Sequence, residues 1–90
     1  NPFNPSTTLS WMQEKPEKLD LYVYTLPGQL VEHITLGEYS GGYHQFVWQP
    51  KKLSSGVYMI QLAGKEFLAT QKVIYSKWLH PYTGGLSETY

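Results

Sequence analysis

The sequence predicts an all-β protein, folded as an antiparallel β-sandwich. Apolar and polar residues alternate with a period of two along most of the chain, and no segment carries the apolar stripe of a helix. Glycine, proline and serine interrupt this alternation about every 8 to 12 residues, which predicts about six or seven short strands. Aromatic residues make up 16% of the 90 residues. Their large apolar area suits a single small domain that must still bury a core.

The first two expected strands are separated by a polar segment that contains Pro16. We expect the first strand over residues 7–13, with Leu9 and Trp11 on one face. The second is expected over residues 19–24, where leucine and valine alternate with aspartate and tyrosine. This pattern is typical of a strand with one buried face.

Glycine marks the next two reversals. Residues 26–29 read Leu-Pro-Gly-Gln, which predicts a type II turn with Gly28 at the positive-φ position. A third strand is expected over residues 30–36, and a reversal that contains three glycines follows over residues 37–42.

Three further strands complete the expected sandwich. Residues 43–49 alternate, with three ring side chains on one face: His44, Phe46 and Trp48. Leu53 is then an isolated apolar residue, expected to fill part of the core, before the Ser-Ser-Gly turn at 54–56. The last strands are expected over residues 57–62 and 67–75.

Residues 78–90 break this pattern, because proline and a glycine pair punctuate a segment that is still rich in aromatic residues. We expect an extra C-terminal arm or hairpin there, beside a domain over residues 1–77. Its apolar side chains are candidate contacts for assembly with a neighbouring chain: Trp78, Leu79, Tyr82 and Tyr90.

Charge and composition exclude several classes of protein. The net charge is zero, with seven lysines and no arginine, whereas proteins that bind nucleic acids present a basic face. No apolar run approaches the about 20 residues of a membrane span. The absence of cysteine removes disulfides and thiolate metal sites. Because the chain opens on Asn1 rather than Met, we interpret it as a piece of a longer or processed protein.

No pattern of residues predicts an enzyme, a cofactor site or a metal site. His33, His44 and His80 lack the spacing of a metal-binding pair within one element. We expect His44 to be a histidine at the edge of the core, bonded to a backbone carbonyl, and Asp20 to lie on a solvated strand face. The Ser-Ser-Gly turn at 54–56 lacks both a paired base and a strand-to-helix elbow.

Tyrosine leaves two alternatives open. One is a carbohydrate-binding module, with a stacking platform on the protein surface made by Tyr22, Tyr24, Tyr39 and Tyr43. The other, which we favour, is that these tyrosines pack their rings on strand faces and keep their hydroxyls in water.

Five segments in register carry a resemblance to a known family. They are NPFNPSTTL at 1–9, LYVY at 21–24 with GQLV at 28–31, GYHQFVW at 42–48, LSSGVY at 53–58 and QKV at 71–73. Together they resemble the C-terminal sorting domain (type A) of cargo proteins of the type IX secretion system, over about residues 1–77. The same region is similar to the immunoglobulin-like module of the flagellar hook-capping protein.

The resemblance implies an immunoglobulin-like sandwich of about seven strands at the C-terminus of a larger protein of Bacteroidetes or related phyla. It implies a non-catalytic sorting and anchoring role, with export via the periplasm to the cell surface or beyond. The implied partners are outer-membrane components of the secretion system and a sortase-like peptidase that removes the domain. The positions that match the family's motifs are Asn4, Pro5, Gly28, Leu53, Gly56, Tyr58 and Lys72.

These positions also have physical roles that stand without the family. Gly28 and Gly56 are expected at turns that a β-carbon would hinder, Leu53 and Tyr58 in the core, and Pro5 in a stiff linker. We expect recognition to use an exposed edge strand or the terminal strand, to which a partner strand can add.

Two departures from the family pattern stand out. Family members end soon after the strand that contains Lys72, whereas residues 78–90 extend this chain. Thr25 also stands where Asp or Asn is usual before the first turn. The extension favours an alternative function, that of a structural immunoglobulin-like block in an extracellular assembly or filament. Such a block would self-associate through an edge strand or the C-terminal arm.

Overall fold

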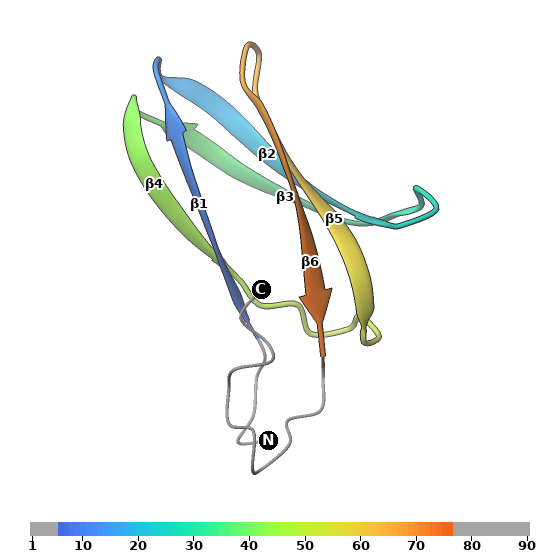
Figure 1. The fold of residues 1–90 in the computed structure, drawn as a ribbon. Coiled ribbons are helices and arrows are strands. Elements are labelled where there is room, and N and C mark those ends of the chain that lie inside the picture. The colour runs from blue at the N-terminus through green and yellow to red at the C-terminus, as the bar shows by residue number, and fades with distance from the viewer. Residues whose placement is uncertain (1–5, 77–90) are drawn as a thin grey trace.

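The computed structural model describes residues 6–76, which form six strands and no helix. The strands, labelled in Figure 1, are β1 (Thr7–Gln13), β2 (Glu17–Thr25), β3 (Leu30–Tyr39), β4 (Gly42–Trp48), β5 (Gly56–Ala63) and β6 (Leu68–Tyr75). The predicted all-β class is confirmed, and the described residues supply six of the about seven strands expected. Within 6–76 no helix is long and apolar enough to cross a membrane.

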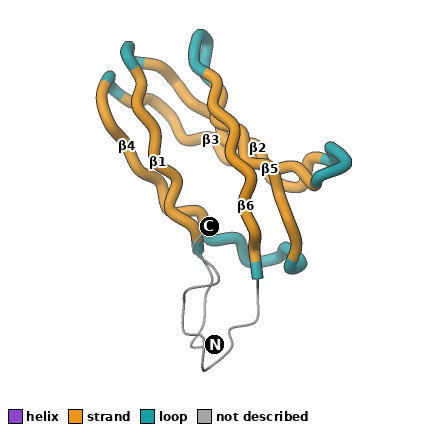
Figure 2. The backbone as a smooth tube through the Cα atoms, viewed as in Figure 1, coloured by secondary structure: helices purple, strands orange, loops and turns teal. Residues whose placement is uncertain are grey.

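The strands form two antiparallel sheets of unequal width. β1 pairs with β4 in a two-stranded sheet, and the other sheet has four strands in the order β3-β2-β5-β6. The narrow sheet lies over the wide one, and the turns gather at the ends of the strands (Figures 1 and 2). Antiparallel sheets packed in this way bury one face each.

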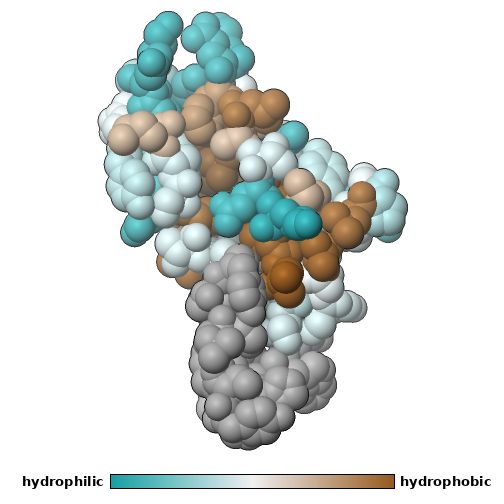
Figure 3. Space-filling model, viewed as in Figure 1, coloured by the Kyte–Doolittle hydropathy of each residue, from teal (hydrophilic) through white to brown (hydrophobic). Residues whose placement is uncertain are grey.

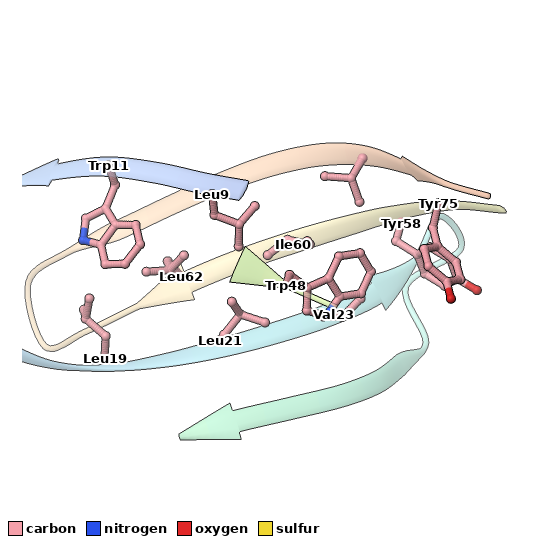
Figure 4. Packing of buried hydrophobic residues seen from close by; sticks show 11 residues of the cluster. Leu9, Trp11, Leu19, Leu21, Val23, Trp48, Tyr58, Ile60, Leu62 and Tyr75 are labelled. Atoms are coloured by element: carbon pink, nitrogen blue, oxygen red, sulfur yellow. The ribbon is translucent and has the colours of Figure 1, made fainter. Parts of the chain in front are cut away.

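The core fills the space between the sheets (Figure 4). Its largest fully buried side chains come from both sheets: Trp48, Leu19, Leu21, Ile60, Val23 and Val73. The alternation read from the sequence places them there, because every second residue of a strand faces the same way. In β1 the burial alternates without a break from Thr7 to Gln13.

Two local predictions are corrected by the structure. Gly37 was expected in the reversal after the third strand, but it lies inside β3 with φ of 92°. It pairs with Leu19 where the register shifts, so it forms a β-bulge. The first turn closes one residue earlier than expected, because the Gly28 N–H donates to the Thr25 carbonyl oxygen at 2.9 Å.

Several expectations lie outside the described residues. Asn4 and Pro5 lie before the first described residue, Ser6. The domain boundary expected at residue 77 lies after the last described residue, Ser76. The four candidate assembly contacts also lie there: Trp78, Leu79, Tyr82 and Tyr90. Their roles stay predictions.

Candidate recognition surface

Four of the seven motif residues lie at one end of the wide sheet, which we call the motif end. Register places them together, because Thr25 of β2 pairs with Tyr58 of β5, and Gly56 of β5 pairs with Tyr75 of β6. The end of β2, the start of β5 and the end of β6 therefore lie at the same end of the wide sheet, and the β2–β3 turn follows directly after β2. The motif residues concerned are Gly28, Leu53, Gly56 and Tyr58.

The β2–β3 turn depends on Gly28, whose φ is 107°. No atom lies within 4 Å of the position a β-carbon would take, so the backbone angle alone selects glycine. The hydroxyl of Thr25 accepts the backbone N–H of Gln29 at 3.1 Å. Threonine thus supplies a side-chain acceptor at the residue that precedes the turn.

Tyr58 ties the loop before β5 to the core. Its ring is buried beside Trp48, with ring centroids 6.3 Å apart, and its hydroxyl donates to the Ser54 carbonyl oxygen at 2.6 Å. Leu53 packs, partly buried, against the same core. A tyrosine near the start of a strand that bonds back to the preceding loop is also found in immunoglobulin sandwiches, where it is called a tyrosine corner.

Gly56 does not need to be glycine for its conformation, which corrects the expectation from the sequence. Its φ is not positive, and an added β-carbon would meet the Tyr58 ring at 3.8 Å, an ordinary contact. The argument from a hindering β-carbon therefore holds for Gly28 alone of these two glycines.

Lys72 lies apart from the other motif residues, exposed on the outer face of β6. Across the sheet it pairs with Met59 of β5, which in turn pairs with Tyr24 of β2. The described motif residues thus divide between the motif end and the outer face of the wide sheet.

One lateral side of the sandwich, where β3 and β4 are the edge strands, is closed by side chains; we call it the closed side. The indole N–H of Trp48 donates to Glu32 Oε1 at 3.0 Å, which joins β4 to β3. Tyr39 and His44 meet edge to face with ring centroids 5.0 Å apart. Both contacts link the two sheets directly.

Gln13 completes the closed side from the end of β1. It is only 3% exposed, accepts the indole N–H of Trp11 at 2.8 Å and donates to the Tyr39 carbonyl oxygen at 3.2 Å. Its amide also donates to the Lys15 carbonyl oxygen at 2.9 Å. A buried amide with this many partners holds its surroundings in one arrangement.

The opposite lateral side, bounded by β1 and β6, is the open side. Within residues 6–76, β1 pairs only with β4 and β6 only with β5, so each leaves one edge without a strand partner. A groove of about 110 Å³ lies between them. Its lining comes from β1, β5 and β6: Leu9, Ser10, Trp11, Ile60, Leu62, Ala69, Thr70 and Gln71.

Hydrophobic side chains also reach the surface along the open side. On the face that carries β1 and β6, they gather above and below a hydrophilic band (Figure 3). Leu68 and Ile74 of β6 are also exposed, but they share the outer face of the wide sheet with Lys72 and do not line the groove.

Two of the histidines contribute contacts within the sandwich. His44 Nε2 is 2.6 Å from the Ser40 carbonyl oxygen, which confirms the expected histidine at the core edge bonded to a backbone carbonyl. His33 stacks on Tyr22 at 4.6 Å and lies 3.0 Å from Asp20 Oδ1, on the exposed face of the wide sheet. In the part of the chain that the structure describes, no three metal-ligating side chains come together.

The four tyrosines considered as a sugar platform do not share a surface. Tyr22 and Tyr24 stack on the outer face of β2, with ring centroids 6.4 Å apart. Tyr39 packs against Trp11 at 5.4 Å, toward the interior. Tyr43 is exposed on the outer face of the other sheet. A common platform of these four rings is therefore not formed.

Sequence reasoning missed Gln13 and Glu32. Gln13 continues the inward-facing series of Leu9 and Trp11, so the period of two already indicated a buried amide. Each buried indole N–H also requires an acceptor. Which side chain supplies this acceptor depends on how the strands pair, and the sequence pattern does not contain that information.

The model of one protein family, described as the secretion system C-terminal sorting domain, matches residues 1–76. This range includes all six strands of the sandwich. No curated protein and no solved structure matches the chain.

Proposed function

The chain belongs to the family of secretion system C-terminal sorting domains, and we propose that it directs a fused cargo protein through the type IX secretion system to the cell surface. Membership in this family implies a sorting signal for export to the cell surface or the extracellular space. The single observation that carries the proposal is the match over residues 1–76, because it includes the whole described sandwich rather than one short motif.

The proposed mechanism is binding, without bond making or breaking by the domain itself. Domains of this family act as signals and are generally non-catalytic. The described motif residues support this, since Tyr58 and Leu53 hold the fold and Gly28 shapes a turn. The domain then serves as a preformed surface, and binding requires little ordering of the chain.

The proposed partners follow from the same family. We propose that outer-membrane components of the secretion system bind the domain after it has reached the periplasm. A sortase-like peptidase then separates it from the cargo, with residues 1–77 as the sorting unit.

A secretion assay tests this function. A periplasm-directed fluorescent protein is fused to residues 1–90 or 1–77 and expressed in a host with a type IX system and in the same host without its outer-membrane translocon. We expect surface or medium fluorescence only in the first host. Retention of both fusions in the periplasm of the first host would show that the domain is not a sorting signal. Export of the 1–77 fusion alone would assign residues 78–90 another role.

A further inference from the structure

The edge of β1 lacks the features that normally protect a free strand edge. Its seven residues, Thr7 to Gln13, include no charge and no proline, and all seven pair with β4 in an unshifted register. The edge strand β3, in contrast, carries Glu32 and Glu38 and two register shifts. Charges and bulges are the means by which proteins prevent an edge from pairing with another chain.

The inner face of β6 is only half covered by the narrow sheet. Val73 and Tyr75 are buried, whereas Gln71 is exposed although it points to the same face. Register confirms its direction, because Gln71 pairs with Ile60, which is 1% exposed in the core. An exposed residue on an inward face marks the place where the covering layer ends.

The groove on the open side joins these two features. Its floor is apolar, with Leu9, Ile60 and Leu62 among the lining residues, and Ser10, Thr70 and Gln71 add polar groups. The volume of about 110 Å³ is several times the about 30 Å³ of one water molecule. It therefore has room for a small apolar side chain.

We propose that the open side binds an extended strand of another polypeptide, which pairs with the edge of β1 that has no strand partner within residues 6–76 and inserts a small apolar side chain into the groove. This proposal rests on the proposed sorting function. In it, the secretion machinery supplies the strand that pairs with β1. Added strands of this kind gain affinity from main-chain hydrogen bonds and specificity from alternate side chains.

The chemistry of the open side defines the strand that fits. None of the residues that line the groove is charged, and neither is any residue of β1. A charged side chain inserted there would lose its hydration without gaining a partner. The bound segment is therefore apolar and uncharged at every second position.

The first experiment adds a charge to the groove and measures secretion of the fluorescent fusion. Gln71→Lys places an ammonium group over the groove, and Gln45→Lys adds the same charge at an exposed glutamine on the outer face of β4. Both positions are exposed, so each variant should keep its thermal midpoint within about 2 °C of the parent. We expect Gln71→Lys to lower secretion about tenfold or more, and Gln45→Lys to leave it unchanged.

The second experiment measures binding without the secretion system. The purified chain is mixed with a blocked peptide of alternating valine and threonine, equal in length to the seven residues of β1. We expect amide hydrogen exchange in β1 to slow about tenfold in the parent and in Gln45→Lys, and not in Gln71→Lys. A peptide with lysine in place of valine should have no effect.

The outcomes separate the two proposals. If the parent fusion is exported and Gln71→Lys is exported equally well, the sorting function stands and the groove is not the binding site. If the parent fusion is not exported, the sorting function is wrong, and slowed exchange in β1 still decides whether the groove takes a strand. If the chain forms dimers that Gln71→Lys abolishes, the occupant is a second copy and a strand of the machinery is ruled out.

Discussion

The two lateral sides of this sandwich differ in how the edges of the two sheets are connected. On the closed side, Glu32 receives the indole N–H of Trp48, and Gln13 bonds both Trp11 and the backbone of β3. On the open side, β1 and β6 leave a groove with an apolar floor, and an unprotected edge runs beside it. One side uses polar side chains to join the sheets, and on the other, within residues 6–76, one edge of β1 and one edge of β6 have no strand partner.

This difference separates stability from recognition within one small domain. A side whose buried polar groups are all bonded contributes to a single rigid arrangement, and substitutions there should unfold the protein. A side with a free edge contributes little to that arrangement but can pair with a partner strand. Substitutions of exposed residues on the open side, such as Gln71, should therefore change binding and leave the free energy of unfolding nearly unchanged.

The largest effect is expected at Gln13. Gln13→Leu leaves the Trp11 indole N–H and the Tyr39 carbonyl oxygen without their partner, so we expect the free energy of unfolding to fall by about 2–3 kcal/mol. Met12→Ala is the control, because Met12 is 65% exposed on the same strand and should cost less than about 0.5 kcal/mol. Urea denaturation measures both. Equal losses of unfolding free energy in the two variants would show that the hydrogen bonds of Gln13 do not stabilise the closed side.

A smaller effect is expected at the bridge between Glu32 and Trp48. Glu32→Ala removes the acceptor of an indole on a side chain that is 1% exposed, which should cost about 1–2 kcal/mol. Trp48→Phe removes the donor, and a double-mutant cycle should give a coupling energy of about 1 kcal/mol. Additive effects of the two substitutions would mean that the bridge does not hold the closed side together.

The motif end, which the two sides share, offers a matched pair of glycines. Gly28→Ala forces a β-carbon onto a backbone with φ of 107° and should cost about 1 kcal/mol. Gly56→Ala meets only an ordinary contact with Tyr58 and should change stability by less than about 0.5 kcal/mol. If Gly56→Ala abolishes secretion while the fold stays intact, the motif at this position serves recognition rather than conformation.

The smallest effect is expected in the pH dependence of stability, at Tyr75 of β6. Burial, and next the nearby Tyr58, raise the pKa of the Tyr75 phenol. Its contribution to stability is therefore complete below the unfolded pKa of about 10 and is lost as the pH rises through the folded pKa. Tyr75→Phe should make the alkaline loss of stability less steep in thermal unfolding between pH 9 and 11, a window set by the unfolded pKa of about 10.

Tyr43 provides the control of opposite sign. Hydrogen bonds with Ser10, and next with Gln45, lower the pKa of its exposed phenol, so the folded state loses this proton more readily than the unfolded state. Tyr43→Phe should make the alkaline loss of stability slightly steeper. A change in the same direction for both variants would contradict the assignment to these two phenols.

Much of the fold could be predicted from the sequence, because strand faces follow from a period of two. The alternation of Leu19, Leu21 and Val23 with polar residues and tyrosine placed the core face of β2, and the structure buries all three. The carbonyl bond of His44 and the positive φ of Gly28 were also expected and are confirmed. These features depend on near neighbours in the chain.

Other features could not be predicted because they depend on the pairing of distant strands. Glycine at position 37 indicates a turn in the sequence, but pairing with β2 places it at a β-bulge inside β3. Glu32 reads as one more solvated carboxylate until Trp48 of the other sheet is placed beside it. Among the motif residues, Gly56 matched the family pattern, yet its backbone is one that any residue adopts.

The sequence by itself therefore determined the all-β class, the faces of the strands and, through five motifs in register, the family. Only the tertiary structure decided which strands became edges and which of the two lateral sides closed. Local alternation and turn residues specify how each strand is made, within a span of a few residues. An edge is defined by what is absent beside a strand, and that depends on the order in which distant segments pair.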